Sequence, residues 1–121
     1  MLIKTILANV KRAPRTPYLA LARVRDLTSD SNIGYIGNIS TGGFMLFANR
    51  ILPYQSRHLL SIKLPHPTRG DITIKVGTRT VWQIKDMQKP KQQSTGLEIL
   101  AIEPDDFLAF LQSAKAYGIA A

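Results

Sequence analysis

The stretch NISTGGF, residues 38–44, combines residue types that bind small polar ligands. In a β-strand, residues two apart face the same side, so Asn38 and Ser40 would present an amide and a hydroxyl together. Gly43, with Gly42 beside it, would let a planar ligand approach the backbone and would offer it an N–H group. Because amides and hydroxyls both donate and accept hydrogen bonds, this pattern suits a purine edge better than a bare anion.

A basic stretch, KRAPRTP at residues 11–17, could supply the complementary charge. Its two prolines disfavour both a helix and a central strand, so it is predicted to be an extended, exposed arm. The guanidinium groups of Arg12 and Arg15 can grip guanine O6 and N7, or a phosphate, with two hydrogen bonds, and Lys11 adds charge. Strand and arm together predict a site in which the arm clamps a guanine nucleotide.

Motifs for catalysis are incomplete. Gly37 and Gly42 have the spacing that opens a phosphate-binding loop, but the lysine and hydroxyl residue that complete that motif do not follow. Ser40 lacks the Gly-x-Ser-x-Gly context of a hydrolase nucleophile. The two histidines match no metal-ligand spacing and are predicted to be surface residues, His58 and His66. The sequence therefore predicts a binding protein with no catalytic, metal or cofactor site.

The composition fits one globular domain with an anionic partner. The 121 residues are 45% hydrophobic, and 16 Lys and Arg against 8 Asp and Glu give a formal charge of +8. There is no cysteine, so the chain offers no disulfide or thiolate site. Its apolar stretches are shorter than the roughly 18 residues of a membrane span, and its start lacks a signal-peptide cleavage site. A cytoplasmic protein is expected.

Short strands would position the candidate ligand-binding residues. Apolar or alternating runs bounded by turn residues predict six or so strands: 18–25, 33–40, 43–48, 58–64, 71–76 with 78–84 after or through a kink at Gly77, and about 96–100. Two segments have helical spacing instead. Residues 1–10 indicate a short helix, and residues 104–117 begin with proline and acids, carry an apolar stripe and end at Gly118. The strands and the C-terminal helix imply an all-β antiparallel barrel or sandwich, from residue 18 to 121, closed by that helix.

The arm and the NISTGG stretch together resemble the signature of the PilZ domain, a bacterial receptor for cyclic di-GMP. That signature is Arg-x-x-x-Arg on a basic arm, a first strand, and then Asp or Asn-x-Ser-x-x-Gly. Asn38, Ser40 and Gly43 fill the second motif, and the resemblance continues through TVWQI to GLEIL, covering residues 11–100. It implies a six-stranded antiparallel barrel followed by a helix, an effector protein as partner, and a role in motility or biofilm signalling. It also implies cyclic di-GMP contacts from Lys11, Arg12, Arg15, Asn38, Ser40, Gly42 and Gly43.

One position departs from the signature, because Lys11 stands four residues before Arg15 and lacks the planar fork of arginine. Two functions therefore stay open beside a cyclic di-GMP receptor that relays binding to a protein. One is a PilZ-type interaction module that binds no nucleotide, and the other is a basic barrel for single-stranded nucleic acid, which would need exposed aromatic platforms. Arg79 is a further candidate ligand contact. The aromatic candidates are predicted to lie mostly in the core: Tyr18, Tyr35, Phe44, Phe47, Tyr54 and Trp82.

Overall fold

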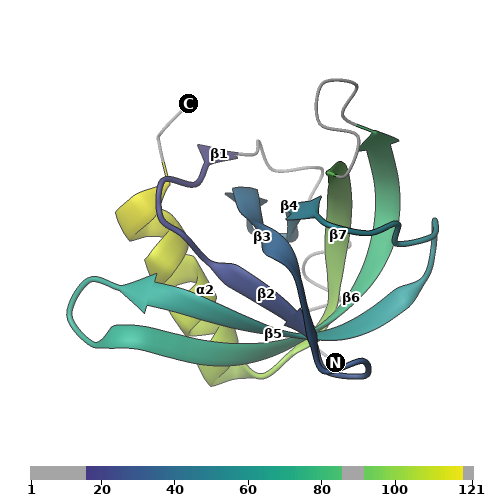
Figure 1. The fold of residues 1–121 in the computed structure, drawn as a ribbon. Coiled ribbons are helices and arrows are strands. Elements are labelled where there is room, and N and C mark those ends of the chain that lie inside the picture. Colours follow the sequence, from purple (N-terminus) through teal and green to yellow (C-terminus); the bar gives the residue numbers. More distant parts are fainter. Residues whose placement is uncertain (1–15, 86–91, 119–121) are drawn as a thin grey trace.

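A computed structural model describes residues 16–85 and 92–118, which form a β-barrel with one helix packed beside it (Figure 1). The elements are β1 (Thr16–Pro17), β2 (Arg23–Asp26), β3 (Ser31–Ser40), β4 (Gly43–Ala48), β5 (Arg57–His66), β6 (Gly70–Lys85), β7 (Gln93–Ile102) and α2 (Pro104–Tyr117). Helix α2 covers the range that the sequence predicts. The predicted helix at residues 1–10 and most of the predicted arm lie outside the described residues.

Six antiparallel strands close the barrel. The order is β3-β2-β5-β6-β7-β4, and the β3–β4 hairpin pairs the last strand with the first. The two residues of β1 also pair with β3, opposite Ile39 and Asn38. Closure leaves the long strands without the unpaired edges that an open sheet would have. The barrel prediction is thus confirmed, and the sandwich alternative is excluded.

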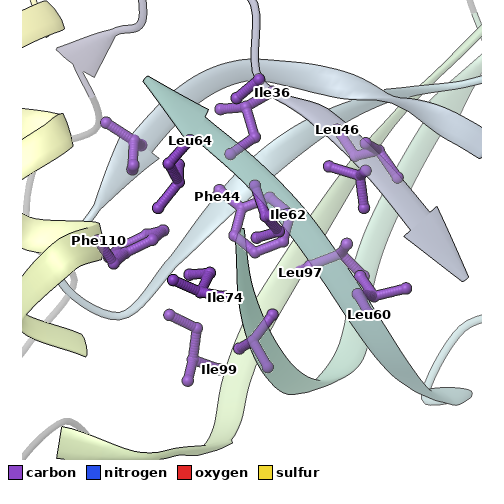
Figure 2. Packing of buried hydrophobic residues seen from close by; sticks show 14 of the residues in the cluster. Ile36, Phe44, Leu46, Leu60, Ile62, Leu64, Ile74, Leu97, Ile99 and Phe110 are labelled. Carbon is purple, nitrogen blue, oxygen red and sulfur yellow. The ribbon is translucent and has the colours of Figure 1, made fainter. Parts of the chain in front are cut away.

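The core fills the barrel and extends to the helix. Alternate residues of each strand face inward, as in β6, where Ile74 and Val76 are buried and Ile72 packs against the core. Figure 2 shows Phe110 of α2 reaching towards Phe44 of β4, and the centroids of the two rings are 6.3 Å apart. The helix therefore contributes its apolar stripe to the barrel core, as predicted.

The predicted first strand at 18–25 is wrong in part. Residues 18–22 form no strand, although the Tyr18 N–H still donates to the Gly37 carbonyl of β3 and the Ala22 carbonyl accepts from Ile36. Between them, the Leu19 N–H donates to the Tyr117 carbonyl at the end of α2. Tyr18 is buried there, and its hydroxyl lies 2.5 Å from Ser113 Oγ of the helix. The helix thus takes the Leu19 N–H and the Tyr18 side chain, and this interrupts the strand that the sequence predicts.

Strand β6 runs through Gly77 without ending, but its register shifts twice, between Gly77 and Thr78 and between Thr80 and Trp82. Thr78 and Thr80 face inward and are buried. Regular alternation would also turn Trp82 inward, whereas the second bulge inserts one residue and turns it outward. The prediction that Trp82 belongs to the core is therefore wrong.

No helix among the described residues is long and apolar enough to cross a membrane.

Candidate functional site

The outer wall of the barrel carries the candidate ligand-binding side chains in two adjoining rows. Cross-strand pairing places one residue from each of five strands side by side in what we call the serine row: Ser40, Gly43, Glu98, Arg79 and Arg57. These residues face outward because their neighbours, such as Ile39 and Leu97, are fully buried. Residues that are far apart in the sequence therefore share one line on the surface.

The second row runs parallel to the first, and we call it the asparagine row. It contains Pro17, Asn38, Met45, Gly96 and Trp82. Asn38 and Ser40 thus face the same side of β3, as the i, i+2 spacing predicts, although a bulge lies between Ile36 and Asn38. The two rows bring together all of the predicted site residues that the structure describes, apart from Gly42, which lies in the hairpin turn beside Gly43.

Asn38 and Ser40 of β3 each donate a side-chain hydrogen bond to β4. The Asn38 amide donates to Met45 Sδ at 3.5 Å, and the Ser40 hydroxyl donates to the Gly43 carbonyl at 3.3 Å. The 3.3 Å bond of Ser40 is longer than the usual range of about 2.5–3.0 Å for O–H···O bonds and is therefore weak. A ligand could replace this contact at small cost, so the Ser40 hydroxyl is suited to exchange partners.

The two glycines of the hairpin have different surroundings. A Cβ atom at Gly43 would lie 2.0 Å from the carbonyl oxygen of Leu97, so the close approach of β4 to β7 itself requires a glycine there. A Cβ atom at Gly42 would meet nothing within 4 Å, and Gly42 is not among the described glycines with a positive φ. The fold thus explains Gly43, whereas Gly42 leaves open space beside the serine row.

The other end of the asparagine row is formed by Trp82 lying on Gly96. A Cβ atom at Gly96 would come within 2.1 Å of the indole Nε1 atom, so the indole rests directly on the glycine backbone. Gly43 and Gly96 are both buried. The Trp82 indole covers Gly96, whereas Gly43 leaves a low surface without a side chain between Ser40 and Glu98 in the serine row. A flat ligand could lie at this position of the serine row.

An ion pair crosses the serine row beside Gly43. Arg79 Nη2 donates to Glu98 Oε2 at 2.8 Å, and both side chains are 35% exposed. The hydrogen bond and the charge of Glu98 raise the pKa of Arg79. Arg57, which is exposed, pairs across the strands with Arg79. Arg79 thus lies in the same row as Ser40 and Gly43. Strands β7 and β4 lie between its strand, β6, and the strand of Asn38, β3.

The sequence interpretation missed Glu98 and Arg57. Outward orientation could have been read for Glu98 from its position between two apolar residues of the predicted strand, Leu97 and Ile99. Its neighbours across the sheet follow only from the register, which alternation within one strand does not determine. The position of Arg57 opposite Arg79 likewise follows only from the register between β5 and β6.

The end of the basic arm lies beside the asparagine row. Thr16 pairs with Ile39 and Pro17 pairs with Asn38, so the chain enters the described barrel alongside the candidate motif. Lys11, Arg12 and Arg15 lie outside the described residues. Thr16 and Pro17, the last two residues of the predicted arm, thus lie beside the Asn38 half of the signature.

The aromatic candidates divide between the core and the outer wall. Tyr18 and Phe44 are buried as predicted, whereas Tyr35 and Phe47 face outward with their ring centroids 5.3 Å apart. Tyr54 is also exposed. The prediction that most of the aromatic candidates lie in the core is therefore wrong for Tyr35, Phe47 and Tyr54, as it is for Trp82. Phe47 faces outward by alternation with the buried residues of β4, Tyr35 is its partner on the bulged strand β3, and Tyr54 lies in the loop before β5.

His58 is more buried than the sequence predicts. Its side chain is 17% exposed, with Nδ1 3.9 Å from Asp26 Oδ2 and Nε2 2.7 Å from Ser56 Oγ. These residue types resemble a hydrolytic triad, but Ser56 Oγ donates to the Pro53 carbonyl at 2.5 Å. The His58 Nε2–H group must then donate to Ser56, which is the reverse of the polarity that activates a nucleophile. His66 pairs with Gln112 of α2.

Comparisons with known proteins agree with this fold. The family model of the PilZ domain matches residues 9–113, so the chain belongs to the PilZ domain family. This is a family of cyclic di-GMP-binding regulatory modules, and no catalytic family is indicated. The resemblance seen in the sequence is therefore confirmed.

The structure of the Bacillus subtilis inhibitor of motility, MotI/DgrA, is similar to this chain, with a TM-score of 0.68 and 22% sequence identity. The similarity covers 88% of this chain and 51% of that protein, so this chain spans about half of that neighbour's length. At this identity the likeness concerns the fold alone. A search of curated protein sequences finds no significant match.

Proposed function

We propose that this chain is a receptor for cyclic di-GMP that relays binding to a protein partner. The observation that carries the proposal is the register of β1, which sets the end of the basic arm alongside Asn38. A ligand on the outer wall would then lie between arm cations and the polar groups of β3. Family membership supports the choice of ligand, and it implies a bacterial, cytoplasmic protein acting in motility or biofilm control.

Each candidate residue has a distinct role in this proposal. Asn38 and Ser40 donate to and accept from the edge of one guanine base. The bare backbone at Gly42 and Gly43 forms the surface on which that base lies. Arg15 and Arg12 bind phosphate or the guanine O6 and N7 atoms, as guanidinium groups do, and Lys11 contributes charge. Arg79 adds positive charge from the far side of the serine row.

The relay requires two states of the protein that the ligand and the partner distinguish. A ligand shifts such an equilibrium only by the difference between its affinities for the two states. In this proposal the ligand joins the arm to the barrel wall, and the partner protein binds the resulting surface with a different affinity.

Titration calorimetry tests the receptor function directly. Cyclic di-GMP should bind, whereas GTP, cyclic di-AMP and a single-stranded oligothymidine should bind at least tenfold more weakly. If the protein binds none of these ligands and Lys11→Arg does not restore binding of cyclic di-GMP, the receptor proposal fails. A PilZ-type interaction module without nucleotide would then be the better description. Tight binding of the oligothymidine instead would favour the nucleic-acid barrel.

A further inference from the structure

The low surface at Gly43 has hydrogen-bonding groups on both sides. Ser40 lies one strand away on β3, and Glu98 lies one strand away in the other direction on β7. Adjacent strands are roughly 4.8 Å apart, so Ser40 and Glu98 stand about 10 Å from each other across the glycine. A purine ring lying over Gly43 would fill this interval with a hydrogen bond at each end.

Glu98 has the chemistry to recognise guanine in this position. Guanine presents two adjacent donors, N1–H and the exocyclic amine at C2, where adenine has an unprotonated N1 and no amine at C2. An ionised carboxylate only accepts hydrogen bonds, and its two oxygens match these two guanine donors. Among the ten residues of the serine and asparagine rows, Glu98 has the one carboxylate.

Arg79 prepares Glu98 for this role. Its hydrogen bond to Oε2 fixes the carboxylate on the wall and offsets the charge that would otherwise repel the phosphates of the ligand. A carboxylate has about four lone-pair sites, so one bond from Arg79 leaves capacity for a second donor pair. The Glu98 side chain is also 35% exposed, so a ligand can reach it.

We infer that Glu98 is a specificity-determining residue, which accepts hydrogen bonds from the N1–H and C2-amine groups of a guanine base over Gly43. The inference rests on the proposed receptor function and adds to it the group that selects guanine over other purines. Arg79 acts as its positioning residue.

The alternative is an ion pair that only joins β6 to β7. Cross-strand pairs of opposite charge stabilise sheets, and exposed pairs contribute little. The chain offers a matched control, the exposed pair of Lys63 and Asp71, whose atoms Nζ and Oδ2 are 3.8 Å apart between β5 and β6. Neither residue belongs to the serine or asparagine row, so Asp71→Asn should change no ligand affinity.

The test compares cyclic di-GMP with cyclic di-IMP, in which each base lacks only the C2 amine, and with cyclic di-AMP. Calorimetry on the wild-type protein should show at least tenfold tighter binding of cyclic di-GMP than of cyclic di-IMP. Glu98→Gln should weaken cyclic di-GMP binding about tenfold and bring the two affinities within about threefold of each other. Glu98→Asp should retain part of the preference, and Asp71→Asn should retain all of it.

The affinity ratio is measured within each variant, so a loss of folded protein cannot imitate the expected result. If the wild-type protein binds cyclic di-GMP and Glu98→Gln keeps the full preference over cyclic di-IMP, the role of Glu98 is refuted while the receptor function stands. If the wild-type protein does not bind cyclic di-GMP at all, the receptor function itself is refuted, and this inference fails with it.

Discussion

The inner and outer faces of the same three strands show how this barrel separates folding from binding. On β3, β4 and β7 the inner face presents fully buried side chains such as Ile39, Phe44 and Leu97. One residue along each strand, the outer face presents Ser40, Gly43 and Glu98. Because a step of one residue changes the face, a substitution on one face should alter stability and a substitution on the other should alter binding.

Gly43 is the exception that joins the two faces. It belongs to the serine row on the outer face, yet it must be a glycine because the Leu97 carbonyl of the neighbouring strand leaves no room for a side chain. The same absence of a side chain thus lets β4 approach β7 in the barrel and leaves the low surface of the candidate site. Substitutions on the inner face, at Gly43 and on the outer face give predictions that can break or sharpen this comparison.

The largest effect is expected inside, at Phe110. Phe110→Ala should lower the free energy of unfolding by about 3–5 kcal/mol, because the ring is fully buried against Phe44 and its loss leaves a cavity. Leu108, on the same helix and 55% exposed, is the control, and Leu108→Ala should cost less than about 0.5 kcal/mol. Urea denaturation measures both. Equal losses would mean that α2 is not anchored in the barrel through this ring.

Gly43 should show a smaller loss that affects both properties. Gly43→Ala should lower the free energy of unfolding by about 1–3 kcal/mol, since β4 and β7 must separate to admit the methyl group, and nucleotide binding should weaken with it. Gly42→Ala is the matched control, because its methyl group enters open space and should leave stability almost unchanged. Thermal melts together with calorimetry would show whether the two neighbouring glycines differ in this way.

The arm provides a test on the ligand side alone. If the first arm position grips a guanine edge or phosphate with a planar fork, Lys11→Arg should tighten cyclic di-GMP binding at least fivefold, without changing the melting temperature. Arg15→Ala should nearly abolish binding, whereas Arg12→Ala should act mainly at low salt. A change of less than about 1 kcal/mol on Lys11→Arg would indicate that charge suffices at that position.

Much of the fold and part of the site can be predicted from the sequence, because both depend on local patterns. Spacing within one element predicts the strand at 43–48 and the helix at 104–117. It also predicts that Asn38 and Ser40 face the same side of their strand. Trp82 and Glu98 could not be placed in this way. A one-residue bulge reverses the face of Trp82, and the neighbours of Glu98 are set by register between strands.

On the outer face, Ser40→Ala should weaken cyclic di-GMP binding by about 0.5–1.5 kcal/mol, the usual net contribution of one hydrogen bond. The melting temperature should hardly change, because the bond from Ser40 to the Gly43 carbonyl is 3.3 Å long. Ser94→Ala is the control, since Ser94 lies half-buried on β7, outside both rows. If Ser40→Ala melts several degrees lower with unaltered binding, Ser40 is only a turn-forming residue.

The smallest effect concerns Tyr18, where the chain leaves β1 for the helix, and it appears only at high pH. Ser113 Oγ donates its one proton to the Pro65 carbonyl at 2.7 Å, so the Tyr18 hydroxyl must donate to Ser113. Burial raises the pKa of Tyr18 above its ordinary value of 10.0, although the Ser113 hydrogen bond opposes this change. The folded state therefore holds the proton more tightly than the unfolded chain does. Below pH 10 both states are protonated and the stability contribution is complete. As the pH rises above about 10 the unfolded chain ionises first, so stability should fall by at most about 1.4 kcal/mol per pH unit until the folded pKa is passed.

Tyr18→Phe keeps the ring and removes the proton, while the other tyrosines and the lysines titrate in both proteins. The difference in unfolding free energy between wild type and Tyr18→Phe, measured in urea from pH 8 to 11, should shrink or change sign above pH 10. A difference that stays constant over this range would show that the hydroxyl ionises as easily in the folded protein as in water.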